Sequence, residues 1–228
     1  MKYTFIFTIL FCILFFDCHS QAPNLASKSQ IILDTISEEN FDISKLKKTD
    51  FLNLIKIDST FILEMPYATE DNFLKQQVYD CQSCYLRKKT ALALIKANNK
   101  FKELGYHIKI YDCYRPLDVQ KKMWTIVSDP KYVANPATGS IHNRGGAVDI
   151  TLVDINNIEL DMGTKFDFFG EEASHDFLNL PDAVLENRKL LKKILRQSGF
   201  KSFDSEWWHY NLKDARRMPI SNFAWNCN

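Results

Sequence analysis

Two short segments of this 228-residue chain combine residue types that bind metal ions. In the first, His142 and Asp149 stand on either side of the pair Gly145-Gly146. Paired glycines allow a tight turn, so a residue before the turn and one at the start of the following strand can face each other. The arrangement predicts that this imidazole and this carboxylate grip one ion.

The second segment places Glu206 and His209 three residues apart, around Trp207-Trp208. Zinc catalysis needs three protein ligands of the His or Asp type, an open position for water, and a nearby carboxylate that is not a ligand. The two segments together supply this count, with the imidazoles of His142 and His209 and the carboxylates of Asp149 and Glu206. We therefore expect one zinc ion per chain.

Each segment also has an ordinary structural interpretation. A single His with a single Asp is more often a surface pair or a buried histidine with satisfied hydrogen bonds, and Trp207-Trp208 is more typical of core packing. A regular strand would turn Glu206 and His209 to opposite faces. Their joint use in one site therefore requires a bend or a helical turn.

The elements that must position these residues follow from hydrophobic periodicity. Apolar residues recur at helical spacing in some segments, and other segments have the pattern of strands. The predicted helices cover residues 86–104, 117–127 and 183–197, and the predicted strands cover residues 61–67, 107–114, 147–153 and 207–212. Strands and helices mix without strict βαβ alternation, so we predict an α+β fold.

Length and composition limit the class of protein. A chain of 228 residues fits a single globular domain. Its 29 Lys and Arg balance 28 Asp and Glu, which leaves a formal charge of +1, and 46% of its residues are hydrophobic. This composition excludes a disordered chain, and the charge balance gives no electrostatic reason to expect nucleic acid or a membrane surface as partner.

The first twenty residues are predicted to be a secretory signal. Lys2 precedes an apolar run from Phe5 to Phe16 that is too short for a comfortable membrane span. The alternative is lipidation of Cys18, but Asp17 stands where a small residue is expected. We therefore expect an exported protein, periplasmic or secreted, with no transmembrane span in the mature chain.

Removal of residues 1–20 on export would leave two parts of the chain. Residues 21–46 are expected to be an N-terminal arm or tether, and residues 47–228 the catalytic domain. Four cysteines remain in an oxidising space, Cys81, Cys84, Cys113 and Cys227. They allow three pairings. We expect all four to be oxidised and favour a Cys84–Cys113 pair, because it would brace the turn at Arg115.

The segment from Ser140 to Leu152, followed by Glu206 to Tyr210, strongly resembles the D-alanyl-D-alanine dipeptidases. These are zinc peptidases that share a fold with DD-carboxypeptidases and the hedgehog signalling domain. The similarity continues in order through three further segments, residues 67–73, 111–116 and 162–167, and so spans about residues 55–212. The resemblance implies a single domain with a central, mainly antiparallel sheet flanked by helices.

The resemblance implies that His142, Asp149 and His209 hold the zinc ion and that Glu206 is the general base. Arg115 would lie beside the scissile carbonyl, where its permanent charge stabilises the oxyanion. The ordinary interpretation of Arg115 is a surface ion pair with Asp112 or Asp118.

The resemblance also implies how a small substrate is held. Tyr67 and Asp167 would bind its free amine, and Ser140 would lie near its carboxylate. Such an arrangement rejects longer peptides, because an acylated amine has lost its charge and occupies more space. The ordinary interpretations are a solvated loop for Asp167 and packing beside Pro66 for Tyr67.

The function implied in this way is hydrolysis of the free D-Ala-D-Ala dipeptide to two D-alanine. The first alternative is a murein D,D- or L,D-carboxypeptidase or endopeptidase that acts on stem or cross-bridge peptides with the same zinc. The second is a non-catalytic, zinc-stabilised binding module, which the presence of Glu206 and Arg115 disfavours. The expected partner is a small D,D-dipeptide and not nucleic acid, and the sequence leaves the oligomeric state open.

Overall fold

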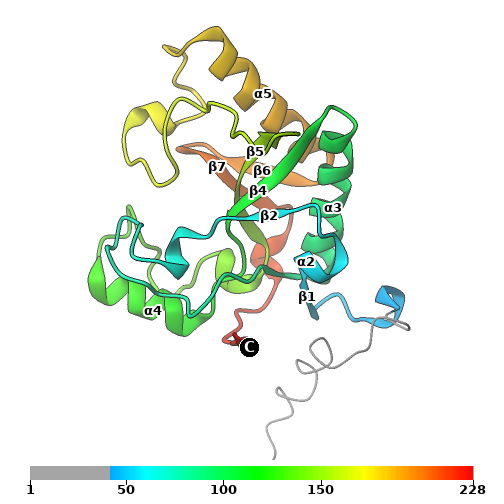
Figure 1. Ribbon diagram of the computed structural model, residues 1–228. Helices are drawn as coiled ribbons and strands as arrows, with labels where there is room; N and C mark the ends of the chain where they lie inside the picture. Colours follow the sequence, from blue (N-terminus) through cyan, green and yellow to red (C-terminus); the bar gives the residue numbers. More distant parts are fainter. Residues whose placement is uncertain (1–41, 228) are drawn as a thin grey trace, which may run out of the picture.

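The computed structural model describes residues 42–227 of the chain. The predicted signal, and the part of the predicted arm that precedes Asp42, lie outside these residues. The described part contains a five-stranded sheet, a two-stranded sheet and the helices that surround them (Figure 1).

The five-stranded sheet is the frame of the fold. Its strand order is β2-β4-β5-β7-β6, in which β2 runs parallel to β4 and every other pair is antiparallel. The strands are β2 (Ile62–Leu63), β4 (Tyr106–Asp112), β5 (Ala147–Asp154), β6 (Phe200–Phe203) and β7 (Glu206–Leu212). The predicted α+β class with a mainly antiparallel sheet is confirmed.

Helices flank this sheet. The longest are α3 (Lys88–Lys102), which contacts β4, and α5 (Asp182–Gln197), which contacts β6 and α3. In Figure 1, α4 (Leu117–Ile126) lies at the end of the molecule away from α5. None of the helices within residues 42–227 is long and apolar enough to cross a membrane.

Short elements complete the described part. Strand β1 (Phe51–Asn53) pairs with β3 (Tyr85–Arg87), and α2 (Leu54–Ile57) follows β1 directly. The 3-10 helices are η3 (Ile43–Lys45), η4 (Pro66–Ala68), η5 (His142–Arg144), η6 (Glu171–Ala173) and η7 (Ala215–Arg217).

The apolar stripe of α5 explains its position on the sheet. Its buried apolar residues recur at helical spacing, as Val184, Leu191, Ile194 and Leu195. Such a stripe is stabilised by burial against a neighbouring layer, while the opposite face stays in water. The helix α3 is amphipathic in the same way, and the chain leaves it through Gly105, whose φ of 81° is a left-handed conformation that favours glycine.

The observed bounds differ from the predicted ones where elements are short. Of the predicted strand 61–67, only β2 pairs with β4, because Pro66 begins η4. The predicted helix 86–104 begins at Lys88, because the residues before it form β3. Strands β1 and β6 were not predicted, since a run of three or four residues is too short to show periodicity.

The disulfide in the described part is not the predicted one. Cys81 and Cys227 are bonded, with Cα atoms 5.8 Å apart, whereas Cys84 and Cys113 are free thiols with no exposed surface. The predicted Cys84–Cys113 pair and the expectation that all four cysteines are oxidised are therefore both wrong. The region around these thiols is braced without it, because they belong to the buried core and the backbone N–H of Tyr114 donates to the oxygen of Tyr85 at 3.1 Å.

A C-terminal strap, residues 218–227, explains the observed pairing. The ring of Trp225 lies 5.5 Å from that of Tyr79 and 5.6 Å from that of Tyr85. This packing leads the strap back across the fold and brings Cys227 to Cys81, a contact that a separation of 146 residues hides in the sequence.

We expect a chain lacking residues 1–20 to contain two free thiols when it is denatured without reduction, namely Cys84 and Cys113. Reduction of the Cys81–Cys227 bond should lower the free energy of unfolding by about 4–5 kcal/mol in the chain-entropy model, because the bond closes a loop of 146 residues. Thiol titration and urea unfolding with and without reductant measure both quantities. Four titratable thiols would contradict the observed pairing.

Candidate active site

The three predicted metal ligands come from three elements that meet at the sheet. His142 is the first residue of η5, Asp149 lies in β5 and His209 lies in β7. Asp149 and His209 are direct partners in the antiparallel ladder, so their side chains share one face of the sheet. Gly145 adopts a left-handed conformation, with φ 65° and ψ 28°, and turns the chain from η5 into β5. The glycine pair thus makes the predicted turn.

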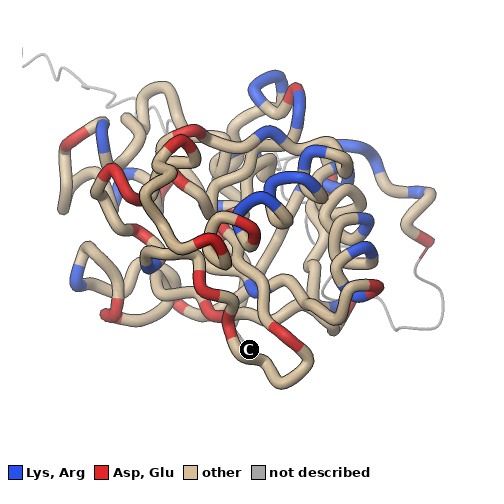
Figure 2. Tube along the Cα trace, turned by 90° about the horizontal axis from the view of Figure 1, so that it is seen from above, with Lys and Arg blue, Asp and Glu red and all other residues tan. Residues whose placement is uncertain are grey.

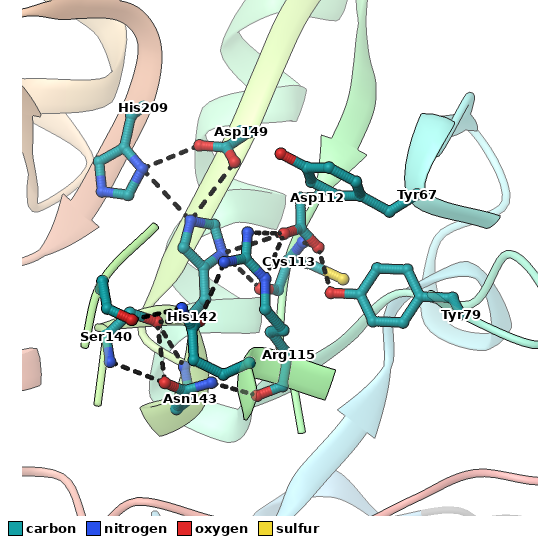
Figure 3. A network of polar contacts seen from close by, with 12 residues as sticks. Tyr67, Tyr79, Asp112, Cys113, Arg115, Ser140, His142, Asn143, Asp149 and His209 are labelled. Carbon is teal, nitrogen blue, oxygen red and sulfur yellow. Dashed lines mark hydrogen bonds and ion pairs between the residues drawn. The ribbon is translucent and has the colours of Figure 1, made fainter. Parts of the chain in front are cut away.

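The ligand atoms of these residues face one another (Figure 3). Nε2 of His142 lies 3.2 Å from Nδ1 of His209, and the two oxygens of Asp149 lie 3.4 Å from His142 Nε2 and 2.9 Å from His209 Nδ1. Ligand atoms at about 2.0–2.1 Å from a tetrahedral zinc ion are about 3.3 Å from each other. The observed spacing fits this value, so the group can hold a metal ion.

Hydrogen bonds outside this group determine which imidazole nitrogens point into it. Nδ1 of His142 lies 2.6 Å from the backbone oxygen of Cys113, and Nε2 of His209 lies 3.0 Å from the side-chain oxygen of Asn211. Each of these nitrogens donates outward, so the other nitrogen of each ring offers its lone pair to the group. The two histidines are thereby oriented as ligands.

Glu206 lies beside the group because β7 bends. In the ladder between β6 and β7, Phe203 pairs with Glu206 but the preceding Ser202 pairs with Tyr210, so three residues of β7 form a bulge. A bulge re-aims the side chains of a strand. It provides the bend that a regular strand lacks, and Glu206 Oε2 lies 3.9 Å from His209 Nδ1.

The two carboxyls nearest the group have opposite electrostatic environments. Burial raises the pKa of Glu206, an effect that the His209 imidazole reduces. Burial also opposes ionisation of Asp149, but the imidazoles of His142 and His209 hold the pKa of that carboxyl below its usual value. Asp149 therefore stays ionised, as a ligand must, while Glu206 binds a proton more readily, as a general base does.

Arg115 is held by an ion pair that is buried and not on the surface. Its Nε and Nη2 lie 3.1 and 2.5 Å from the same oxygen of Asp112, and its Nη1 donates to Gln120 at 3.0 Å. Arg115 is 7% exposed and Asp112 fully buried. Burial disfavours the guanidinium charge, but Asp112 raises the pKa of Arg115 well above its usual value. A permanent cation is thus fixed near His142, whose Nδ1 lies 3.8 Å from the same Asp112 oxygen.

A second bulge directs Asp112 toward the site. Along the ladder between β4 and β5, Ile110 pairs with Ile150 and Asp112 pairs with Asp149, which leaves Tyr111 as the extra residue. In a regular ladder Asp112 would face the position before Asp149 and point to the other side of the sheet. The bulge therefore places both carboxylates on the same face.

Sequence analysis named Asp112 only as a possible surface partner of Arg115 and missed its role in the site. One oxygen of Asp112 binds Arg115, and the other accepts hydrogen bonds from the Tyr79 hydroxyl and the Cys113 backbone N–H, each at 2.8 Å. Asp112 therefore positions Arg115 and does not itself face the metal-binding atoms. The signal for this role was its spacing three residues before Arg115, at the end of a predicted strand.

Tyr67 and Asp167 are brought together next to this network. The Tyr67 hydroxyl donates to Asp167 Oδ2 at 2.8 Å, and the guanidinium carbon of Arg115 lies 5.4 Å from the centre of the Tyr67 ring. Burial raises the pKa of Asp167 well above its usual value, the Tyr67 hydroxyl opposes this, and Asp149 and Glu206 add to it. A cation placed beside Asp167 would stabilise its charged form, so the pair suits an ammonium group.

Ser140 forms hydrogen bonds within its own turn. Its hydroxyl and its backbone N–H bond the side-chain oxygen of Asn143 at 3.1 and 2.7 Å, and Nδ2 of Asn143 donates to the backbone oxygen of Arg115 at 2.8 Å. The Ser140 hydroxyl also lies 3.5 Å from Gln120 Oε1. The structure thus places Ser140 beside the residues that hold Arg115, on the His142 side of the site (Figure 3).

Two recesses reach this site from the surface. One, of about 320 Å³, is lined by Glu206 together with Tyr132 and Phe169, and the other, of about 660 Å³, is lined by Asp167 together with Phe166. Phe168 lines both recesses. The recess at Glu206 and the recess at Asp167 therefore adjoin each other at Phe168.

We expect Asp112→Asn to lower the free energy of unfolding by about 3–5 kcal/mol, because it leaves the buried Arg115 charge without its partner. Urea unfolding measures this change. The matched control is Asp118→Asn, which removes the same charge from an exposed pair with Lys121 and should leave the unfolding midpoint unchanged. Equal effects of the two substitutions would contradict the role assigned to Asp112.

Comparisons with known proteins agree with this geometry. Residues 47–225 match the model of the D-Ala-D-Ala dipeptidase family, peptidase M15. A D-alanyl-D-alanine dipeptidase of Escherichia coli is 35% identical over 179 residues, which cover 78% of this chain and 93% of that protein. One from Enterococcus faecalis is 35% identical over 169 residues, covering 65% of this chain and 84% of the relative.

Among solved structures, the chain is similar to the LdcB LD-carboxypeptidase, at 20% sequence identity and a TM-score of 0.40. The alignment covers 76% of this chain and 73% of the carboxypeptidase chain. The family resemblance expected from the motifs is confirmed by the matched family model and by the Escherichia coli relative. On this evidence the chain is an enzyme that belongs to the D-Ala-D-Ala dipeptidase family of M15 metallopeptidases.

Proposed function

We propose that this protein hydrolyses the free dipeptide D-Ala-D-Ala to two D-alanine with one zinc ion. The observation that carries the proposal is the group of His142, Asp149 and His209, whose ligand atoms lie within 4.8 Å of one another, with Glu206 beside it. The names of the relatives support the substrate. The donor set of two imidazoles and one carboxylate suits zinc and leaves a fourth position open.

When bound, zinc supplies a Lewis acid that polarises the peptide carbonyl and lowers the pKa of water to about 7. Glu206 accepts the proton of the attacking water and returns it to the leaving amine. Its raised pKa suits both steps, because a base that is too weakly basic cannot hold the proton between them.

Arg115 stabilises the oxyanion that forms at the carbonyl. A guanidinium has five N–H donors, and three nitrogens of Arg115 each use one of them on Asp112 or Gln120. Two N–H groups remain for the developing negative charge. Because the side chain is already fixed by Asp112, little reorganisation is needed as the charge appears.

Asp167 and Tyr67 bind the free ammonium of the dipeptide. The carboxylate is half-buried, so an ammonium beside it interacts with it at reduced dielectric and can also donate to the Tyr67 hydroxyl oxygen. An N-acylated substrate offers no charge to this carboxylate. The pair therefore selects for a free amino terminus and hence for a dipeptide.

We also propose that the protein acts outside the cytoplasm, after removal of residues 1–20. The Cys81–Cys227 disulfide supports this, because such bonds persist in oxidising compartments. Mass spectrometry of the protein recovered from an exporting host should give Gln21 as the first residue. Recovery of the uncleaved chain in the cytoplasmic fraction would count against export.

A panel of three substrates tests the proposed activity on the zinc-loaded protein: D-Ala-D-Ala, its N-acetyl derivative and a stem pentapeptide that ends in D-Ala-D-Ala. We expect the free dipeptide to be hydrolysed far faster than the other two. Preference for the pentapeptide would favour a murein peptidase. No hydrolysis at full zinc occupancy would favour a binding module.

We expect the wild-type protein to bind one equivalent of zinc and His142→Ala to lose both the metal and the activity. Metal analysis after gel filtration gives the occupancy. The matched control is His107→Ala, since His107 lies in β4 outside the metal group, and it should keep one equivalent. Full occupancy in His142→Ala would show that the ligand assignment is wrong.

We expect Glu206→Gln to keep its zinc and its unfolding midpoint while turnover falls by about 10²–10⁴-fold, the range for loss of a general base. Glutamine preserves the size and most hydrogen bonds of the side chain and removes only proton transfer. Steady-state kinetics and metal analysis on the same sample measure both. Near wild-type turnover would contradict the mechanism.

We expect Asp167→Asn to reduce kcat/KM for free D-Ala-D-Ala by tens to thousands of times, because losing one partner of a desolvated charge pair costs about 2–5 kcal/mol. Zinc content should not change. The residual rate on N-acetyl-D-Ala-D-Ala, which has no ammonium, should be the same in both proteins. Equal losses on the two substrates would show that Asp167 supports the fold or the metal group instead.

A further inference from the structure

Positive charge is concentrated on two helices that lie away from the metal group. Helices α3 and α5 contain ten Lys and Arg residues and two Asp and Glu residues, a net charge of +8 in a chain whose total is +1. Figure 2 shows Lys and Arg positions along α5, with those of α3 beside it. The near-neutral total therefore hides a strongly basic face.

A groove of about 560 Å³ runs along α5 on this face. Its lining includes Lys189, Lys192, Lys193 and Arg196 of α5, together with His175 and Leu178 from the segment before α5. The four cations follow the helical spacing that puts side chains on one face, over about 10 Å of helix axis. The groove thus offers a row of positive charges and not a single one.

Most of these cations are not neutralised by neighbours. Glu186 lies 3.0 Å from Lys189 at one end of the row. Within residues 42–227, the side chains of Lys192, Lys193 and Arg196 make no ion pair with an acidic group. The row therefore keeps its positive potential, which favours an anionic partner.

The lining of the groove also includes an imidazole with an unused hydrogen-bonding group. Nε2 of His175 is buried and has no hydrogen-bond partner among the described residues. Burial, together with Lys192 and Arg188, lowers the pKa of His175 to about 3, so the ring is neutral at pH 7. A buried polar atom of this kind normally has a hydrogen-bond partner. Nε2 of His175 is covered, so a ligand in the groove would supply this partner only after a movement of the His175 side chain.

The groove and the metal group lie on opposite faces of the sheet. His209 and Tyr210 are consecutive in β7, so their side chains point to opposite faces. His209 belongs to the metal group, whereas the ring of Tyr210 lies 6.0 Å from that of His175. A ligand in the groove therefore does not enter the catalytic site.

We propose that this groove is a binding site for a linear polyanion that carries phosphate-type groups. Several cations in a row match several anionic groups along a chain, which a single phosphate ion does not provide. A concave site also suits a chain better than the flat surface of a bilayer. The proposal is independent of the proposed dipeptidase activity.

Calorimetry with inorganic tripolyphosphate and a longer inorganic polyphosphate tests this site. We expect the longer chain to bind, inorganic phosphate to bind far more weakly, and added salt to weaken binding. Lys192→Glu combined with Lys193→Glu should weaken polyphosphate binding by about tenfold or more, because neutralisation of phosphates by Lys and Arg dominates such affinities. The imidazole signals of His175 should shift in the NMR spectrum when polyphosphate is added.

The matched control is the double substitution Lys47→Glu and Lys48→Glu. These two lysines are exposed and lie far from the groove residues in the sequence. The control makes the same change in net charge and should alter the affinity by no more than about twofold if contact, and not total charge, governs binding. Both double variants should hydrolyse the dipeptide like the wild type, which shows that they are folded.

Three results would overturn the proposal. The first is equal loss of affinity in the two double variants, which indicates unspecific attraction. The second is polyphosphate binding without a shift of the His175 signals, which places the ligand elsewhere. The third is sedimentation with phosphatidylglycerol vesicles in the absence of polyphosphate binding, which assigns the basic face to a membrane surface.

Discussion

The register between β5 and β7 is the constraint on which the site depends. It makes Asp149 and His209 direct partners, so the sheet itself sets the distance between two ligands. His142 then needs only the turn at Gly145 to reach them. A shift of one residue in this register would move either ligand to the opposite face and disperse the group. In a strand, side chains point alternately to the two faces of the sheet. The bulges in β7 and β4 interrupt this alternation locally, and so bring Glu206 and Asp112 to the face that carries the metal group.

Four carboxyl groups surround this register, and each is stabilised by different neighbours. Asp112 faces a guanidinium and Asp149 faces two imidazoles, so both are paired within the protein. Asp167 makes no ion pair among the described residues, and Glu206 has only the more distant contact of 3.9 Å with His209, so burial raises the pKa of each. In the proposed mechanism Asp112 positions Arg115 and Asp149 holds the metal ion, while Glu206 meets the water and Asp167 meets the substrate. The role proposed for each acidic residue thus depends on whether the protein already provides it with a close positive partner.

Much of the fold and the metal group could be predicted from the sequence, because each depends on local patterns. Helical and strand periodicity gave the long elements, and the Gly145-Gly146 turn indicated how His142 could meet Asp149. The irregular features could not be predicted. Bulges leave no signature in periodicity, so the role of Asp112 was missed. The disulfide was assigned wrongly because its partners are 146 residues apart and are brought together by aromatic packing of the strap.

The Cys81–Cys227 bond also makes a covalent ring of the chain from β3 to the strap, which includes both histidine ligands. The ring contains exposed turns, among them residues 155–158 at the end of β5. Proteases cut preferentially at such turns. A single cut there would leave the two fragments joined through the disulfide, with their strands still paired in the sheet. The enzyme is therefore built so that one nick in its peptide chain does not separate its ligands.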